Sequence, residues 1–160
     1  MVMNKYGLAT ILEDRPVGYE FYEDNIPLHL THIDSFRMEL EPVELNNKLR
    51  QLFIGQKAIS TAVKGIANYG PNNDIPVAEL TLSDELVLFH DNLVSFLERE
   101  GAVFKRQHFL NRGFKPHITE IPSIKLFEDE LVTIRSISIA IKENIDIRPK
   151  TKIFSTINFK

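Results

Sequence analysis

The sequence predicts an α+β fold made of two similar halves. Segments in which apolar and polar residues alternate, as in half-buried strands, outnumber the two segments with helical spacing. The expected order is strand, strand, helix and two strands, followed by helix, strand and two strands. One pattern, His-apolar-Thr, occurs once in each half, at 29–31 and at 117–119. No shift in composition marks a boundary, so we expect residues 1–160 to form a single domain.

The first part of the chain carries the first copy of this pattern. We expect a strand, an acidic connection, a second strand and a helix, at 5–12, 13–25, 26–33 and 42–53. Successive side chains of a strand point to opposite faces. The second strand would therefore present His29 and Thr31 on one face and Leu28 and Leu30 on the other. The helix would begin at Pro42, because proline is favoured in the first helical turn.

The chain continues with a hairpin and a second helix. The hairpin would pair strands at 57–67 and 76–82, because the segment between them is rich in turn-forming residues. Ser83 is a favourable cap for the start of the second helix, and Gly101 is a favourable residue for its end. The last three expected strands are one that contains His117, one at 131–141 and one at 152–159.

Composition excludes several classes of protein. The chain has no cysteine, so it forms no disulfide and has no thiolate nucleophile or Cys-bound zinc. A net charge of −3 argues against a surface that is basic throughout, although a local basic patch exists. No apolar run reaches the length of a membrane span, and the first residues do not resemble a signal peptide. We therefore expect a cytoplasmic protein that does not insert into a membrane.

The two histidine-threonine patterns suit phosphoryl transfer without a metal. One neutral imidazole can take a proton from water while a second, as imidazolium, gives one to the leaving oxygen. Both states exist near neutrality because the ordinary pKa of histidine is close to 6.5. The hydroxyls of Thr31 and Thr119 would bind the phosphate oxygens. Lys115 lies on the same strand face as His117, which makes it the best-placed cation to stabilise the negative charge at phosphorus.

The residues His29-Leu30-Thr31 and His117-Ile118-Thr119 resemble the paired motifs of the two-histidine (2H) phosphoesterase superfamily, which includes 2′-5′ RNA ligase-like proteins and RNA cyclic phosphodiesterases. The resemblance implies a bilobal, pseudo-twofold α+β fold with two antiparallel sheets, outer helices and a central groove. It also implies that both motifs face each other in that groove, and it implies a reaction without metal or other cofactor.

The resemblance further implies a role for each residue of the quartet. His29 would act as the acid toward the leaving oxygen and His117 as the base for water, with Thr31 and Thr119 binding phosphate. The pseudo-symmetry of the site leaves the exchange of the two histidine roles open. Many ligase-like members carry an arginine shortly after the first motif, where this chain has His32-Ile33-Asp34.

The favoured substrate class is an RNA end or nucleotide that carries a 2′,3′-cyclic phosphate. A second enzymatic interpretation is cleavage of 2′-5′ oligoadenylate or of cyclic-oligonucleotide defence signals. A third is a module that binds a nucleotide or RNA without turnover. The intact quartet argues against the third, because a pure binder does not need two titratable imidazoles. We expect the protein to act as a monomer.

A basic segment at 105–115 precedes the second motif and is a candidate substrate-binding region. It carries four cations and no acid, interleaved with Phe109 and Phe114. Bases stack on aromatic rings while cations hold phosphates. The other interpretation is a solvated basic loop whose phenylalanines enter the core. The candidate substrate-binding residues are Lys115, Arg112, Phe114 and Tyr69.

The remaining histidines have simpler interpretations. His29 and His32 have the spacing of a metal-binding pair, but residues i and i+3 of a strand point to opposite faces, so we expect no metal site. We expect His32 at an edge or behind the site, His90 packed within the second helix's apolar stripe, and His108 in a solvated loop. If the quartet were only structural, His29 and His117 would be half-buried strand residues whose threonines favour β structure.

Overall fold

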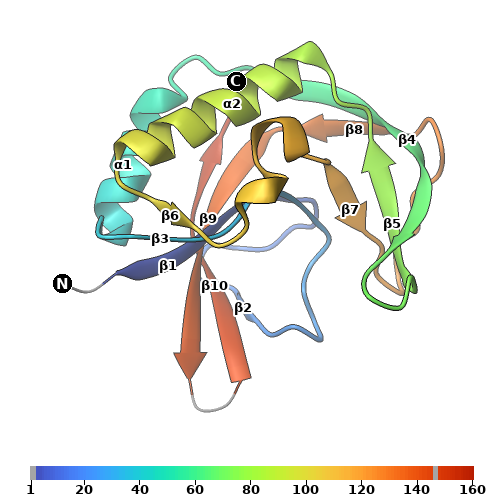
Figure 1. Ribbon diagram of the computed structural model, residues 1–160, viewed down its shortest axis with the longest axis horizontal. Helices are drawn as coiled ribbons and strands as arrows, with labels where there is room; N and C mark the ends of the chain where they lie inside the picture. Colours follow the sequence, from blue (N-terminus) through green and yellow to red (C-terminus); the bar gives the residue numbers. More distant parts are fainter. Residues whose placement is uncertain (1–2, 146–147) are drawn as a thin grey trace.

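The computed structural model describes residues 3–145 and 148–160, and it confirms the predicted α+β class (Figure 1). A large antiparallel sheet carries two α-helices on one side. The strands are β1 (Asn4–Ile11), β2 (Glu20–Phe21), β3 (His29–Met38), β4 (Ile59–Tyr69), β5 (Ile75–Leu80), β6 (Val103–Phe104), β7 (His117–Thr119), β8 (Leu131–Ile134), β9 (Ser136–Ile145) and β10 (Arg148–Asn158). The helices are α1 (Pro42–Leu52) and α2 (Asp84–Arg99), and two short 3-10 turns cover Gln107–Phe109 and Asn111–Gly113.

The sheet joins the two halves of the chain at the motif strands. Its order is β2-β10-β9-β1-β3-β7-β5-β4-β8, with β6 paired to β3. The first five strands of this order and the last four correspond to the two sheets expected for the two lobes. They are continuous because β3 and β7 pair antiparallel, with Leu30 opposite Ile118. The two copies of the motif therefore lie on neighbouring strands.

Both helices cover the same face of the sheet, and their apolar stripes form the core with it (Figure 1). In α1 the buried residues Leu45 and Leu49 are four positions apart, which places them on one side of the helix. The α2 helix begins as predicted, because the side chain of Ser83 accepts a hydrogen bond of 3.2 Å from the backbone N–H of Leu86. No helix of the described residues is long and apolar enough to cross a membrane.

The single strand expected at 131–141 is wrong, because the chain changes partners at Arg135. Before this residue β8 pairs with β4, and after it β9 pairs with β1 and β10. The alternation of apolar and polar residues continues across the break, so periodicity alone could not reveal the change of partner. Across the same junction the backbone N–H of Phe159 donates to the carbonyl of Arg135 at 2.8 Å.

Several strand boundaries also differ from the predicted ones. The motif strand β3 runs from His29 to Met38 and is longer than the expected 26–33. The two-residue strands β2 and β6 were not predicted, because strands this short form through pairing with β10 and β3 and carry no period of their own. The hairpin of β4 and β5 and the position of β7 match the prediction.

Candidate active site

The four residues of the two motifs lie on one face of the sheet. Leu30 and Ile118 are opposite each other in β3 and β7, and both are fully buried in the core (0% exposed). Alternation along a strand directs the neighbours of these two residues to the other face. That face carries His29 and Thr31 from β3, and His117 and Thr119 from β7, all of them half-buried. The structure thus brings together the quartet that the sequence singled out.

Both motif histidines make the same backbone hydrogen bond. His29 Nδ1 lies 2.9 Å from the carbonyl oxygen of Pro27, and His117 Nδ1 lies 2.8 Å from that of Lys115. A carbonyl oxygen can only accept, so Nδ1 carries the proton in each ring. In the neutral form Nε2 is then the unprotonated nitrogen, able to accept a proton. The same tautomer is fixed in both halves of the site.

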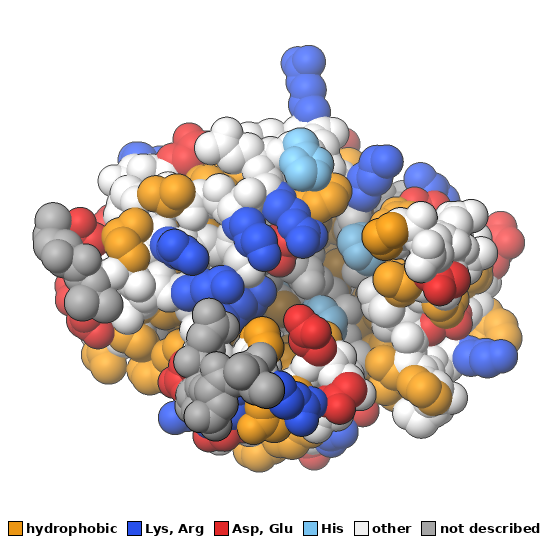
Figure 2. Space-filling model, turned by 60° about the horizontal axis from the view of Figure 1, so that its bottom comes forward, with side chains coloured by type: hydrophobic (Ala, Val, Ile, Leu, Met, Phe, Trp, Pro, Cys, Tyr) orange, Lys and Arg blue, Asp and Glu red, His pale blue; other side chains and the backbone are white. Residues whose placement is uncertain are grey.

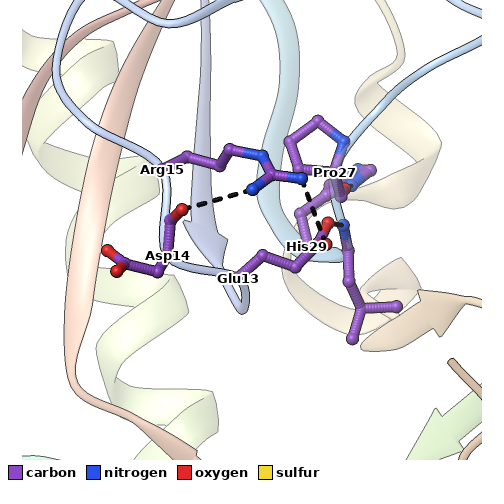
Figure 3. Close-up of polar contacts among 6 residues, drawn as sticks. Glu13, Asp14, Arg15, Pro27 and His29 are labelled. Carbon is purple, nitrogen blue, oxygen red and sulfur yellow. Dashed lines mark hydrogen bonds and ion pairs between the residues drawn. The ribbon is translucent and has the colours of Figure 1, made fainter. Parts of the chain in front are cut away.

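The acidic segment before β3 holds the first motif in place (Figure 3). The carboxylate of Glu13 accepts a hydrogen bond from the backbone N–H of Leu28 and forms an ion pair of 3.4 Å with Arg15. This anchor lies one residue before His29, where β3 begins. The sequence indicated only an acidic connection here, and Glu13 is the residue in it that positions the motif strand.

Two adjoining cavities border three of the four motif residues, His29, Thr31 and His117. Thr31 and Asp34 line both cavities. The cavity on the His29 side measures about 240 Å³, and the cavity on the His117 side about 410 Å³. Figure 2 shows the hollow, with histidine side chains in and beside it and a group of cationic side chains along one wall. The two cavities together form a groove at the junction of the two halves of the sheet.

The imidazole of His29 is more buried than that of His117, and burial affects the pKa of His29. Burial lowers the pKa of His29, and the bond to Pro27 opposes the change only in part. The positive charges of His117 and Lys142 lower the pKa further. In the ligand-free protein His29 is therefore predominantly neutral at pH 7.

Tyr69 stands beside the second histidine. Its ring meets that of His117 edge to face, with 4.9 Å between the ring centroids. Its hydroxyl donates a hydrogen bond of 2.6 Å to Glu79, the residue opposite His117 on β5. Burial and Glu79 raise the pKa of Tyr69 to about 12, so the hydroxyl stays protonated. Tyr69 thereby packs against one side of the His117 ring and lines the larger cavity.

The other predicted substrate-binding residues have different environments. Lys115 is exposed and lines the larger cavity. Phe114 also lines it, but its side chain is buried (7% exposed) and stacks on His90. Arg112 is exposed and lies outside the described linings of both cavities, as does Thr119.

The three remaining histidines lie outside the quartet. Of the two positions expected for His32, the edge is wrong, because β3 is an interior strand and the side chain is buried, with Nε2 2.6 Å from the hydroxyl of Thr10. The position behind the site agrees with the structure, because the buried His32 contributes to the lining of the larger cavity. His90 is a buried packing residue, as predicted, and it also accepts a hydrogen bond of 3.0 Å from the backbone N–H of Asn111. His108 is exposed, as expected. Among the residues that the structure describes, no group of three potential metal ligands occurs.

A cluster of charged residues at the groove was not recognised from the sequence. Asp34 forms ion pairs with Arg106 at 3.5 Å and with Lys142 at 3.8 Å. Lys142 also donates a hydrogen bond of 2.7 Å to the hydroxyl of Ser35. Arg106 lines the larger cavity and Lys142 the smaller. No sequence signal connects Lys142 with the first motif, because β9 reaches β3 only through β1.

No model of a protein family and no curated protein sequence matches the chain. Solved structures match it over almost its full length. E. coli LigT complexed with 3′-AMP aligns with a TM-score of 0.59 and 15% identity, over 99% of both chains. The chain has the fold of E. coli LigT.

Two other structures share the LigT fold with this chain. One is described as a phosphoesterase, with a TM-score of 0.58 and 16% identity over 98% of both chains. The other is the protein TT0787 of Thermus thermophilus, with a TM-score of 0.58 and 16% identity over 97% of both chains. This likeness confirms the α+β architecture that the resemblance of the two motifs implied.

Proposed function

We propose that the protein is a phosphoesterase that opens a cyclic phosphate, or cleaves a phosphodiester, on an RNA end or nucleotide by acid-base catalysis with two histidines and no metal. The 2′,3′-cyclic phosphate is the proposed substrate group. The fold, which this chain shares with LigT and with a protein described as a phosphoesterase, supports phosphoesterase activity in general. Cytoplasmic location and action as a monomer remain part of the proposal.

One observation carries this proposal, namely the matched pair of imidazoles. His29 and His117 lie on paired strands, each with Nδ1–H held by a backbone carbonyl two residues earlier. In each neutral ring Nε2 is then the atom that accepts a proton. A reaction that takes a proton from water and gives one to a leaving oxygen can use one of these rings, neutral, as the base and the other, protonated, as the acid.

The proposed reaction begins with water in line with one P–O bond of the cyclic phosphate. His117 accepts a proton from the water as its oxygen forms a new bond to phosphorus. The P–O bond to one ribose oxygen breaks, and His29, as imidazolium, gives its proton to that oxygen. The product is a phosphomonoester with a free neighbouring hydroxyl, and the two histidines have exchanged protonation states.

Charge on the phosphoryl oxygens is the main electrostatic demand of this reaction. The hydroxyls of Thr31 and Thr119 are proposed as donors to these oxygens, with Lys115 as a nearby cation. Each donor has its largest effect if it is already in position when the charge develops. Thr31, which lines both cavities, is the better placed of the two threonines.

The lowered pKa of His29 has a consequence for its role as the acid. The free protein holds this ring neutral, so donation requires that it first gain a proton. A bound phosphate supplies negative charge close to the ring, which favours the imidazolium. Binding of the substrate phosphate would thus favour the protonated form of His29 that acts as the acid. The competing assignment exchanges the roles of His29 and His117.

Nucleotides are the proposed ligand class. LigT has been crystallised with 3′-AMP, with NADP+ and with ATP. The larger cavity of this chain measures about 410 Å³ and combines aromatic residues with the cations Arg106 and Lys115. A base can stack on the rings while the phosphate meets the cations.

The proposal is tested by mixing the protein with a panel of substrates and measuring the products by mass. The panel contains 2′,3′-cyclic mononucleotides, RNA ended by a cyclic phosphate, 2′-5′ oligoadenylate and cyclic di- and trinucleotides. We expect turnover of the 2′,3′-cyclic phosphates and a loss of at least ~10²-fold in His29→Ala and in His117→Ala. His108→Ala, which changes an exposed histidine outside both cavities, is the matched control.

Other outcomes would replace the proposal. Turnover of oligoadenylate or cyclic oligonucleotides alone would assign the defence-signal interpretation. Binding without turnover of any substrate would assign the non-catalytic module. Unchanged rates in both histidine variants would exclude the two-histidine mechanism, and loss of activity in a chelator would reveal a required metal.

A further inference from the structure

A basic surface continues from the groove along the first half of the sheet. Its cations come from β1, β3, β9 and the segment after β6, and they are Lys5, Arg37, Lys105, Arg106 and Lys142. We call these five residues the basic strip. In Figure 2 Lys and Arg side chains gather along one wall of the hollow that contains the histidines. This gathering is notable because the whole chain has a net charge of −3.

The basic strip brings like charges together on the surface, where its five residues are exposed or half-buried. Lys5 and Arg37 are direct partners across β1 and β3, an arrangement that is unfavourable for two cations. The backbone N–H of Lys105 donates to the carbonyl of Ser35 at 3.0 Å, which holds this lysine beside the same stretch of β3. Lys5, Arg37 and Lys105 thus concentrate positive charge beside one stretch of β3, and packing of the core does not explain these charges.

The described acid that pairs with the basic strip is Asp34, through two ion pairs of 3.5 and 3.8 Å. A single carboxylate does not balance the surrounding cations. Burial lowers the pKa of Lys142, and Asp34 opposes this effect. The neighbouring charges of Lys5, Lys105 and Arg106 lower it further. The basic strip therefore has an excess of positive charge that an additional anion would relieve.

The basic strip is continuous with the active site. Lys5, Arg37 and Lys105 line a cavity of about 310 Å³ together with Ser35. The hydroxyl of Ser35 accepts the hydrogen bond of Lys142, which itself lines the cavity of His29. An extended ligand could therefore lie in the groove and reach the outer cavity without leaving the cationic surface.

An exposed aromatic ring accompanies the cations. Phe109 is 43% exposed, lines the larger cavity and has the guanidinium of Arg106 at 6.0 Å from its ring centroid. Single-stranded nucleic acids bind to surfaces of this kind, where cations track the backbone and rings stack on the bases. A free mononucleotide would occupy only the groove and leave the outer cavity unused.

We propose that the basic strip binds the phosphates on the 5′ side of the reacting one, so that the preferred substrate is a single-stranded oligoribonucleotide. This inference rests on the proposed function for the reacting group, and it adds the length and strandedness of the substrate. Arg106 and Lys142 would meet the nearest of these phosphates, and Lys5, Arg37 and Lys105 the next ones.

The experiment compares two substrates with the same cyclic end. One is a 2′,3′-cyclic mononucleotide and the other is a single-stranded RNA of about six nucleotides, a length within the range of roughly 4–16 nucleotides that single-strand-binding domains cover. We expect kcat/KM to be higher for the oligomer and to fall more steeply with salt. In the double variant Lys5→Gln/Lys105→Gln we expect the preference for the oligomer to fall at least tenfold. Lys64→Gln, an exposed lysine of β4, is the matched control.

A binding measurement separates this inference from the proposed function. Fluorescence anisotropy with the same RNA ended by a 3′-phosphate requires no turnover. For this RNA the slope of log K against log salt should decrease in magnitude by about 0.7 for each phosphate that the variant no longer neutralises. If binding weakens in the double variant while wild-type protein hydrolyses nothing, only the proposed function fails. If preference and binding both match those of Lys64→Gln, the basic strip is not a nucleic-acid site.

Discussion

The imidazole of His90 stacks on the ring of Phe114, with centroids 3.9 Å apart and ring planes 5° from parallel. The same imidazole accepts the backbone N–H of Asn111 at 3.0 Å. One buried side chain of α2 thus holds two points of the segment that leads into the second motif. Because Lys115 and His117 lie one and three residues after Phe114, His90 is a positioning residue for the larger cavity.

Substitution of His90 should impair substrate binding more than chemistry. In His90→Leu the N–H of Asn111 loses its partner, at a cost of about 1–3 kcal/mol. We expect KM for a 2′,3′-cyclic nucleotide to rise by about tenfold while kcat changes less. Steady-state kinetics with Leu88→Ala, an exposed residue of the same helix, provide the comparison.

The conservative variant His90→Gln distinguishes positioning from general destabilisation. Glutamine keeps an acceptor for Asn111 but loses the stacking on Phe114, so it should recover part of the lost affinity. An equal rise of KM in both variants, in step with their loss of thermal stability, would argue against a positioning role.

Gly113 should tolerate no side chain. A Cβ atom at this position would lie 1.8 Å from the carbonyl oxygen of His108, so the backbone would have to move. We expect Gly113→Ala to displace the turn before the second motif and to reduce kcat/KM by at least tenfold. Gly65→Ala is the matched control, because a Cβ there meets nothing within 4 Å. Equal activity of the two variants would contradict the prediction.

Two buried histidines should make the fold sensitive to acid. Burial lowers the pKa of His32 to about 3 and that of His90 to about 4, from 6.5. Below pH 6.5 the unfolded chain therefore binds protons that the folded chain does not, and stability falls as the pH falls. For each histidine the free energy of unfolding should decrease by about 1.4 kcal/mol per pH unit. The window extends from pH 6.5 to about 4 for His90.

Denaturant titrations at several pH values measure this dependence. His90→Gln should lower the dependence of the free energy of unfolding on pH by the equivalent of about one proton, whereas Leu88→Ala, an exposed residue of the same helix without a titratable group, should leave it unchanged. A wild-type slope near zero between pH 6.5 and 4 would show that the two rings are already protonated in the folded protein.

The pH dependence of the rate reports the state of His29. As the acid, this ring must be protonated, so activity should fall as the pH rises through its pKa. Burial lowers that pKa in the free protein, so the alkaline limb of kcat/KM should lie below pH 6.5. The phosphate of bound substrate raises the pKa, so the same limb of kcat should lie at higher pH. Both assignments give an acidic and an alkaline limb, so the residual activity of His29→Ala identifies the role: loss of the alkaline limb assigns His29 as the acid, and loss of the acidic limb assigns it as the base.

The sequence predicted the parts of the fold that depend on local pattern. Ser83 and the apolar stripe of α2 mark a helix in any context, and the alternation around Leu30 places His29 and Thr31 on the face opposite the core. The change of partner at Arg135 is not local, because β8 and β9 have the same alternation and differ only in the strands beside them. Pairing is a property of the assembled sheet.

In the candidate site, too, the features that depend on local sequence pattern could be predicted and those that depend on the assembled sheet could not. The quartet repeats one pattern and could be found from spacing, whereas Asp34 and Lys142 meet only after three strands assemble. The tautomer of His29 and His117 was also beyond prediction, since it depends on backbone carbonyls that the fold orients. The role of Glu13 could not be predicted either, because its partner is the backbone N–H of Leu28, and any residue at that position except proline would offer the same donor.

The connection at Arg135 makes the stability of each half of the molecule depend on the other. The chain passes from β8, at the end of the second half, to β9, within the first, with one residue between them. The last residues return to the same junction, where Lys160 donates to the carbonyl of Gln56 at 2.9 Å. The sheet of the first half therefore includes strands from the end of the chain, and the last residue bonds to the segment before β4. Neither half is an independent folding unit, so the groove should form and melt in the same cooperative transition as the core.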